Sequence, residues 1–175
     1  MKALIKANKK NIYPASIKLI LTNNNTASGI KIADTNNIKS YFFNKKEFEV
    51  LAQDILIKEN IEFICLAGFM QILSKKFIQN WKNRIINIHP SYLPQFKGLN
   101  AQKQAINAKA GYSGCTVHYV TNEIDDGEII LQKKVDINEN EDIESLSKKI
   151  LKEEHNIYPK ALKIAVNKIL KHNIK

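Results

Sequence analysis

One short segment constrains the fold of this chain more than any other: residues 87–91, with the sequence Asn-Ile-His-Pro-Ser. It ends a mostly apolar run, residues 84–89, which is typical of a buried strand. Pro90 has no N–H to donate to a neighbouring strand, so the strand should stop at His89. Side chains two apart on a strand point the same way, so Asn87 and His89 should share one face at its carboxyl end.

In open parallel sheets, ligands bind at the carboxyl ends of the strands. An amide beside an imidazole suits a carbonyl oxygen that becomes an oxyanion, but a lone histidine at a strand end is often structural. Two later segments favour chemistry: a strand-like run at 116–119 and an Asp-Asp-Gly turn at 125–127. A carboxylate near His89 would raise the pKa of His89 and fix the orientation of its ring. We therefore hypothesise that the Asn, His and Asp side chains catalyse an acyl transfer.

Strands and helices alternate along the chain, which predicts a doubly wound α/β domain with a mostly parallel sheet and an antiparallel strand pair near the C-terminal half. A length of 175 residues suits one domain with a sizeable core. The predicted strands are 17–21, 40–43, 63–66, 85–89, 115–120 and 128–135, and the predicted helices are 1–8, 27–34, 45–59, 75–81, 101–108, 143–155 and 159–171.

The net charge of +10 raises the question of nucleic acid as a partner. The lysines are scattered and no basic stripe is interleaved with aromatic residues, so we do not expect nucleic-acid binding. No apolar run approaches the ~20 residues of a membrane span, and the N-terminus lacks the long apolar segment of a signal peptide, so cytoplasm is the default. Cys65 and Cys115 have no metal-type spacing. A metal site built from His89, His118, Asp125 and Cys115 is a remaining alternative.

Three spaced motifs in this chain resemble one family, the phosphoribosylglycinamide formyltransferases. The first is residues 87–94 with Gly98 after it, the second is residues 114–121 followed by 125–127, and the third is residues 154–159. They occur in the family's order and span nearly the whole chain, so together they are far more specific than any one alone. The His-Pro-Ser form favours this family over the methionyl-tRNA formyltransferases, which tend to carry His-Ala-Ser.

The resemblance implies a Rossmann-like variant of the α/β fold and a transferase activity. The expected reaction moves a formyl group from 10-formyltetrahydrofolate, as co-substrate, to the amine of 5-phosphoribosylglycinamide in de novo purine biosynthesis. No metal is required, the partners are these small molecules, and the chain would act as a monomer or homodimer. The implied catalytic residues are Asn87, His89 and Asp125.

The resemblance also implies binding residues for each substrate. The loop after the strand 63–66 would hold the folate ring through backbone groups and an apolar wall, and Lys46 would meet a carboxylate of the folate tail. Gln71 stands where family members often carry Arg, and Glu128 stands where they commonly carry Pro. We expect the loop 91–98 to close over substrate. The implied residues are Lys46, Met70, Gln71, Ile72, Leu73 and Asn87 for folate, Pro90 and Glu154 for the phosphoribosyl substrate, and His118 and Gly98 in support.

The start of the chain departs from the resembled family. Family members open with a strand and a Gly-x-Gly-type phosphate turn, about a dozen residues, before a helix like residues 1–8. This chain opens directly with the helix, so we interpret residues 1–175 as a single, N-terminally truncated formyltransferase domain. Either Met1 is an internal methionine of the natural gene or the truncation is real. Because the first strand is central in such folds, the sheet should show a gap between the strands 17–21 and 63–66.

Two other functions fit the same residues. Formyltetrahydrofolate deformylases use a similar Asn, His and Asp set with water as the acceptor, although they usually carry an extra N-terminal regulatory domain. The absent phosphate turn also fits a non-catalytic, truncated relative.

Overall fold

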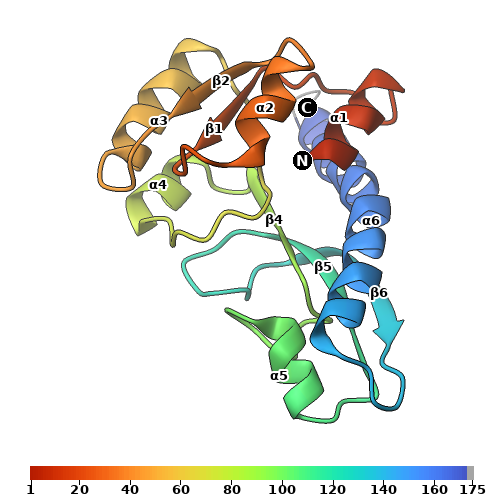
Figure 1. Cartoon of the computed structure of the whole chain (residues 1–175). Helices are drawn as coiled ribbons and strands as arrows, with labels where there is room; N and C mark the ends of the chain where they lie inside the picture. Colours follow the sequence, from red (N-terminus) through yellow and green to blue (C-terminus); the bar gives the residue numbers. More distant parts are fainter. Residues whose placement is uncertain (173–175) are drawn as a thin grey trace.

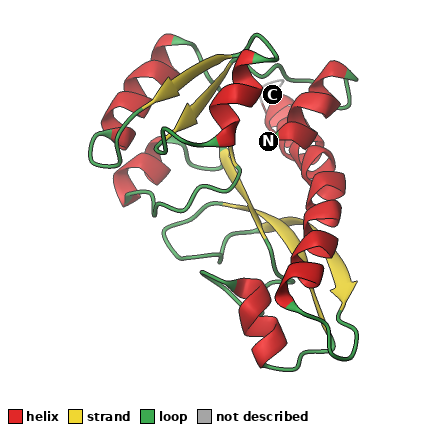
Figure 2. Cartoon of the chain, in the orientation of Figure 1, coloured by secondary structure: helices red, strands yellow, loops and turns green. Residues whose placement is uncertain are grey.

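Two β-sheets form the centre of the molecule, and helices cover them (Figures 1 and 2). The computed structural model describes residues 1–172. In the first sheet, β1 (Leu19–Thr22) pairs with β2 (Lys39–Phe42). The second sheet has the order β3 (Ile64–Leu66), β4 (Ile85–His89), β5 (Tyr112–Tyr119) and β6 (Ile129–Asp136). The helices are α1 (Lys2–Lys9), α2 (Ser28–Asp34), α3 (Phe48–Lys58), α4 (Lys75–Asn80), α5 (Ala101–Asn107) and α6 (Ile143–His172).

The predicted α/β class is confirmed, with one difference in strand direction. β1 and β2 run parallel, as do β3 and β4, and β5 and β6 form the expected antiparallel pair. β5 also runs antiparallel to β4, so the four-stranded sheet is mixed rather than mostly parallel. Within residues 1–172, β1 does not pair with β3, so the expected gap in the sheet is present.

The core lies on both faces of the four-stranded sheet. Ile86 on β4 and Val117 on β5 pack with α6 in one apolar cluster, whereas Ile85 belongs to a second cluster with residues of α3 and α4. Successive side chains of a strand point to opposite faces, so Asn87 and His89 follow Ile85 to the face away from α6. The strand periodicity therefore places both polar residues on one side.

α6 is a single helix of 30 residues, whereas the sequence predicted two helices, 143–155 and 159–171. Pro159 removes one backbone hydrogen bond and so favours a helix start. It is buried inside α6, within a continuous apolar stripe that contacts β5 and β6. Burial of this stripe holds the helix together across the proline. The stripe contains Leu146, Ile150, Ile157, Tyr158, Ala161, Leu162 and Ala165.

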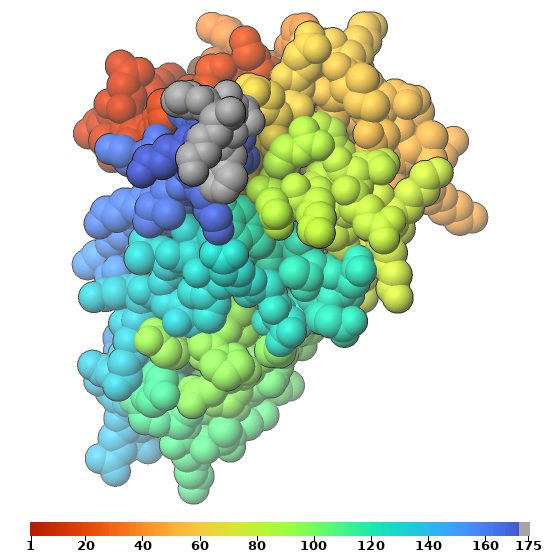
Figure 3. Space-filling view, turned by 180° about the vertical axis from the view of Figure 1, so that it is seen from behind, coloured from red at the N-terminus to blue at the C-terminus, as the bar shows by residue number. Residues whose placement is uncertain are grey.

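The other predicted elements match within a few residues, and Ser74 caps α4, since its hydroxyl accepts from the Phe77 N–H. Seen from behind, the segment coloured red to yellow covers one end of the molecule and the segment coloured green to cyan covers the other (Figure 3). No helix among residues 1–172 combines the length and the apolar character needed to cross a membrane.

Candidate functional site

The carboxyl ends of β4 and β5 hold an amide and two imidazoles, which the pairing of the strands brings together. Asn87 pairs with His118 in the register of the two strands, and the Asn87 Nδ2 lies 3.5 Å from the His118 Nε2. His89 lies two residues further along β4 on the same face. The predicted shared face of Asn87 and His89 is confirmed. The His118 Nδ1 donates to its neighbouring Tyr119 carbonyl at 2.8 Å, which directs the Nε2 toward Asn87 and the turn beyond β5.

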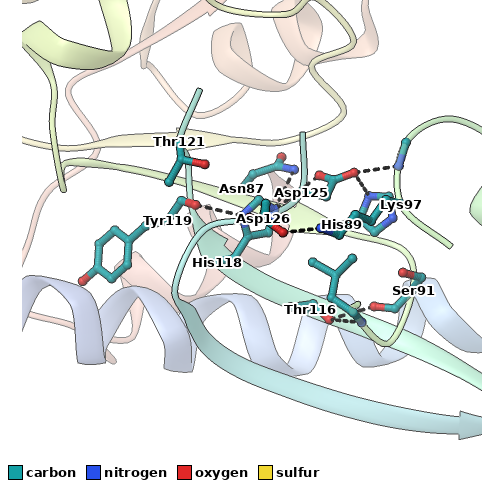
Figure 4. Close-up of polar contacts among 12 residues, drawn as sticks. Asn87, His89, Ser91, Lys97, Thr116, His118, Tyr119, Thr121, Asp125 and Asp126 are labelled. Carbon is teal, nitrogen blue, oxygen red and sulfur yellow. Dashed lines mark hydrogen bonds and ion pairs between the residues drawn. The ribbon is translucent and has the colours of Figure 1, made fainter. Parts of the chain in front are cut away.

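Asp125 bridges the two histidines (Figure 4). Its Oδ2 lies 3.2 Å from the His89 Nδ1 and its Oδ1 lies 3.4 Å from the His118 Nε2. The Gly98 N–H donates to the same Oδ2 at 2.8 Å. The three ionisable side chains are only 3% to 10% exposed. The structure therefore joins the buried side chains of His89, His118 and Asp125 with half-buried Asn87 and Gly98 in one cluster.

The electrostatics of this cluster correct one expectation. Burial lowers the pKa of His89, and the Phe96 carbonyl and the Asp125 carboxylate, which favour the charged ring, only partly oppose it. We expected a raised pKa from the carboxylate, but desolvation is the larger effect. Burial raises the pKa of Asp125, but the His118 and Gly98 hydrogen bonds and the nearby imidazoles outweigh it, so this pKa is lowered. Near neutral pH the cluster therefore holds a carboxylate beside a readily deprotonated His89.

The loop between β4 and α5 is tied to the site rather than free. The His89 Nε2 faces the Phe96 carbonyl at 2.9 Å, and the Ser91 hydroxyl donates to the Gln95 carbonyl at 2.5 Å. The Gln104 side chain on α5 donates to the Lys97 carbonyl at 3.0 Å. These contacts set the position of the loop, and its closure over a substrate stays a prediction.

A buried hydroxyl anchors the start of this loop, and the sequence analysis missed it. Thr116 on β5 donates to the Ser91 carbonyl at 2.8 Å and accepts from the Leu93 N–H at 3.1 Å. Gln132 on β6 donates to both Thr116 and the Leu93 carbonyl. The only signal in the sequence was a hydroxyl residue between Cys115 and Val117 in a predicted strand.

Replacing Thr116 with valine should therefore destabilise the protein by ~2–3 kcal/mol, because valine keeps the shape but leaves buried backbone groups at Ser91 and Leu93 unpaired. Urea unfolding measures the change. Thr35→Val is the matched control, since the exposed Thr35 hydroxyl donates to the Ile32 carbonyl of its own helix and accepts from the neighbouring Asn36 side chain. Equal unfolding midpoints for the two variants would contradict this role of Thr116.

The loop after β3 exposes the apolar side chains that the resemblance assigned to folate. Met70 is 74% exposed and Ile72 is 71% exposed, whereas Leu73 is buried. Gln71 accepts a hydrogen bond from Asn23 at 2.9 Å and donates to the Lys45 carbonyl at 3.3 Å. A pocket of about 430 Å³ lies here, lined by Asn23, Asn24, Asn25, Phe42, Lys45, Gly68, Met70 and Gln71.

Lys46 is exposed, but Lys45 rather than Lys46 lines this pocket. A second pocket, of about 540 Å³, lies beside the Asp125 turn. Its lining residues are Lys97, Gly98, Glu123, Ile124 and Asp126. The two pockets offer space for ligand beside the loop after β3 and beside the turn after β5.

The residues assigned to the phosphoribosyl substrate lie apart from each other in the fold. Pro90 directly follows β4 and is partly buried, whereas Glu154 lies on α6, which packs on the other face of the sheet. Burial raises the pKa of Glu154 to about 7, and the charged Met1 amine opposes this shift. Among the residues described, no hydrogen bond or ion pair joins Glu154 to the histidine cluster.

The raised pKa of Glu154 predicts a pH-dependent stability. The unfolded carboxyl ionises near its ordinary pKa of 4.5 while the folded one still holds its proton, so stability should fall as pH rises from about 5 to 8. Glu154→Gln should remove up to roughly 3 kcal/mol of that fall, since one pKa unit corresponds to about 1.4 kcal/mol. Denaturant unfolding at both pH values tests this, with Glu144→Gln on the exposed side of α6 as the control. A parallel pH dependence in wild type and Glu154→Gln would refute it.

Cys115 lies apart from the other residues of the alternative metal site, and Glu128 contacts α6. Cys115 lies in the apolar cluster facing α6, on the opposite face of β5 from His118, so the proposed ligand set does not form. Within residues 1–172, no group of three His, Cys, Asp or Glu side chains is arranged to hold a metal ion. Glu128, where relatives commonly carry Pro, forms an ion pair with Lys168 on α6 at 2.9 Å.

Comparison with known proteins agrees with this architecture. Residues 1–162 match the family model described as formyl transferase. The chain is 42% identical to a trifunctional purine biosynthetic protein adenosine-3 from Chironomus tentans over 100% of this chain, but it spans only 13% of that relative. It is 36% identical to a phosphoribosylglycinamide formyltransferase from Bacillus subtilis, over 92% of this chain and 86% of the relative. The crystal structure of phosphoribosylglycinamide formyltransferase from Anaplasma phagocytophilum superimposes with a TM-score of 0.90 and 42% identity, over 95% of this chain and 80% of that one.

Proposed function

The chain belongs to the formyl transferase family, and we propose that it transfers the formyl group of 10-formyltetrahydrofolate to the amine of 5-phosphoribosylglycinamide. One observation carries the proposal: at the carboxyl end of β4, Asp125 contacts both buried histidines, His89 and His118, and the half-buried Asn87 amide lies 3.5 Å from the His118 Nε2. Such a cluster has the donor, the proton carrier and the carboxylate that acyl transfer to an amine requires. The reaction belongs to purine biosynthesis, and we infer a cytoplasmic enzyme that acts as a monomer or homodimer.

The reaction exchanges one carbon–nitrogen bond for another. The substrate amine bonds to the formyl carbon, the carbonyl oxygen becomes an oxyanion, and the bond from that carbon to the folate N10 then breaks. The Asn87 amide is only loosely engaged, at 3.5 Å from His118, so its N–H is available to donate to the oxyanion. A donor aimed at developing charge in a site shielded from water stabilises the transition state strongly.

The same reaction moves one proton from the attacking amine to the folate N10. Both nitrogens of His89 face acceptors, the Nδ1 toward Asp125 and the Nε2 toward the Phe96 carbonyl, so we propose that a water beside Asp125 relays this proton. Once protonated, the ring is held between the Asp125 carboxylate and the Phe96 carbonyl, the two acceptors that its nitrogens face. His118 supports the pair by holding the other oxygen of Asp125.

The proposed binding residues come from several elements outside this cluster. The exposed side chains of Met70 and Ile72 would form the apolar wall for the folate ring, with the backbone of Gln71 and Leu73 beside them. Lys46 would meet the folate tail, near the pocket at Lys45. We propose Pro90 and Glu154 for the phosphoribosyl substrate.

The test is to incubate the 175-residue chain with 10-formyltetrahydrofolate, with and without 5-phosphoribosylglycinamide, and to measure the products by mass spectrometry. We expect N-formylated product only when the acceptor is present. Formate release without acceptor would instead assign a hydrolase of the deformylase type. If calorimetry shows that the folate binds but none of it is consumed, the chain is a non-catalytic relative. Either result would overturn the proposed transfer.

A further inference from the structure

Three consecutive residues, Phe96 to Gly98, hold the cluster from the outside, and we name residues 96–98 the strap. The Phe96 carbonyl contacts the His89 Nε2 at 2.9 Å, and the Gly98 N–H contacts the Asp125 Oδ2 at 2.8 Å. Both partners of the His89–Asp125 pair are therefore held by backbone groups of the strap (Figure 4). A displacement of the strap would loosen both groups at once.

The residue between these two contacts fastens the strap to the turn that carries Asp125. The Lys97 ammonium forms an ion pair with Asp126, the neighbour of Asp125. The Gln104 side chain secures the same segment from α5, donating to the Lys97 carbonyl at 3.0 Å and to the Leu99 carbonyl at 2.9 Å. The strap thus connects β4, α5 and the turn after β5.

We propose that Lys97 and Asp126 are positioning residues, whose ion pair keeps the strap seated so that His89 and Asp125 stay at working distance. The proposal deepens the proposed function, because it assigns regulation of the same cluster to two residues outside it. Neither residue needs to touch the reacting atoms. Their effect passes through the Phe96 carbonyl and the Gly98 N–H.

The size of the effect follows from exposure. The Lys97 and Asp126 side chains are 36% and 57% exposed, and exposed ion pairs are weak and screened by salt. The ion pair should therefore shift the seated fraction of the strap only severalfold. If the ion pair positions the strap, the protection of the strap should depend on salt concentration. A purely structural contact of the loop would not show this dependence.

Amide hydrogen exchange at Gly98 tests the proposal without any assay of activity. Exchange rates are first corrected for the rate of an unstructured peptide of the same sequence. After this correction, Gly98 should exchange roughly three- to tenfold faster in Lys97→Met than in wild type, whereas in Lys97→Arg it should stay within about twofold of wild type. The combined swap Lys97→Asp with Asp126→Lys should restore part of the protection. Lys39→Met, which removes an exposed ion pair with Glu59 far along the chain, is the matched control. Unchanged Gly98 exchange in Lys97→Met would overturn the proposal.

Steady-state kinetics adds a second readout. At saturating substrates, Lys97→Met should lower kcat severalfold with KM little changed, and raising salt from about 50 to about 500 mM should lower kcat of wild type but not of Lys97→Met. Equal salt dependence of kcat in both would overturn the proposed role of the ion pair. If wild type transfers no formyl group, the proposed function fails, and Gly98 exchange still decides whether the strap is fastened by Lys97.

Discussion

Replacing Asp125 with asparagine should lower formyl transfer by roughly two to four orders of magnitude while folate still binds. Asp125 is the one carboxylate that contacts both His89 and His118. Asparagine keeps the shape but removes the charge that stabilises a protonated ring. The backbone should persist, because Asp125 has a φ of 49° and asparagine adopts this left-handed conformation as readily as aspartate. Turnover per folded molecule, with calorimetric folate binding, is the measurement.

The competing explanation is that Asp125 only shapes the turn before Gly127, a common role for aspartate. Under that explanation, Asp125→Asn would cost stability but leave turnover per folded molecule nearly intact, and NMR would show an unmoved His89 titration. The lowered pKa of Asp125 also predicts a pH-dependent stability. The ionised carboxylate stabilises the folded state at pH values above the pKa of Asp125 in the unfolded chain, and this contribution is lost as pH falls through its pKa in the folded protein. Asp125→Asn should therefore lose less stability in acid than wild type. Asp136→Asn, at an exposed strand end, is the control.

Replacing Gly127 with alanine should destabilise the protein by about 3 kcal/mol or more, because overpacking against rigid backbone cannot relax cheaply. A Cβ at Gly127 would lie 1.7 Å from the Tyr119 carbonyl oxygen and 2.8 Å from its carbon. The clash can be relieved only by moving the end of β5 or the turn itself. Because Asp125 lies two residues away, turnover of the remaining folded molecules should also fall.

Gly111→Ala is the matched control for this effect, since a Cβ there meets nothing within 4 Å. Urea unfolding of both variants, combined with activity per folded molecule, separates stability from function. Similar unfolding free energies for Gly127→Ala and Gly111→Ala would show that the turn can move aside at little cost. Normal turnover in a destabilised Gly127→Ala would show that the position of Asp125 does not depend on Gly127.

The sequence was sufficient where a local pattern carries the information. β4 begins and ends where its apolar run and Pro90 predicted, and the shared face of Asn87 and His89 follows from strand periodicity alone. The proximity of Asp125 to His89 could not be predicted from a local pattern. The residues between β5 and the turn do not determine how closely the turn approaches β4. Three spaced motifs of one family supplied that information.

The remaining features depend on tertiary structure. Pro159 reads locally as a helix start, but packing of its neighbours on the sheet keeps α6 continuous. The pKa of His89 depends on how deeply the ring is buried, and the residues next to His89 in the sequence do not indicate this depth. The contacts of Thr116 and Lys97 join segments 23 to 29 residues apart, beyond any local periodicity.

The division of the strands between two sheets has a consequence for cooperativity. Within residues 1–172, no strand ladder links β1 to β3, so side chains such as Leu19 and Ile64 join the two sheets by packing in one apolar cluster. Sub-global opening of such a boundary costs less than global unfolding, so the two sheets can behave as separate foldons. Trp81, the only tryptophan of the chain, lies in that cluster. Its fluorescence therefore reports separation of the sheets, while amide exchange in β5 reports opening of the four-stranded sheet that carries the histidines.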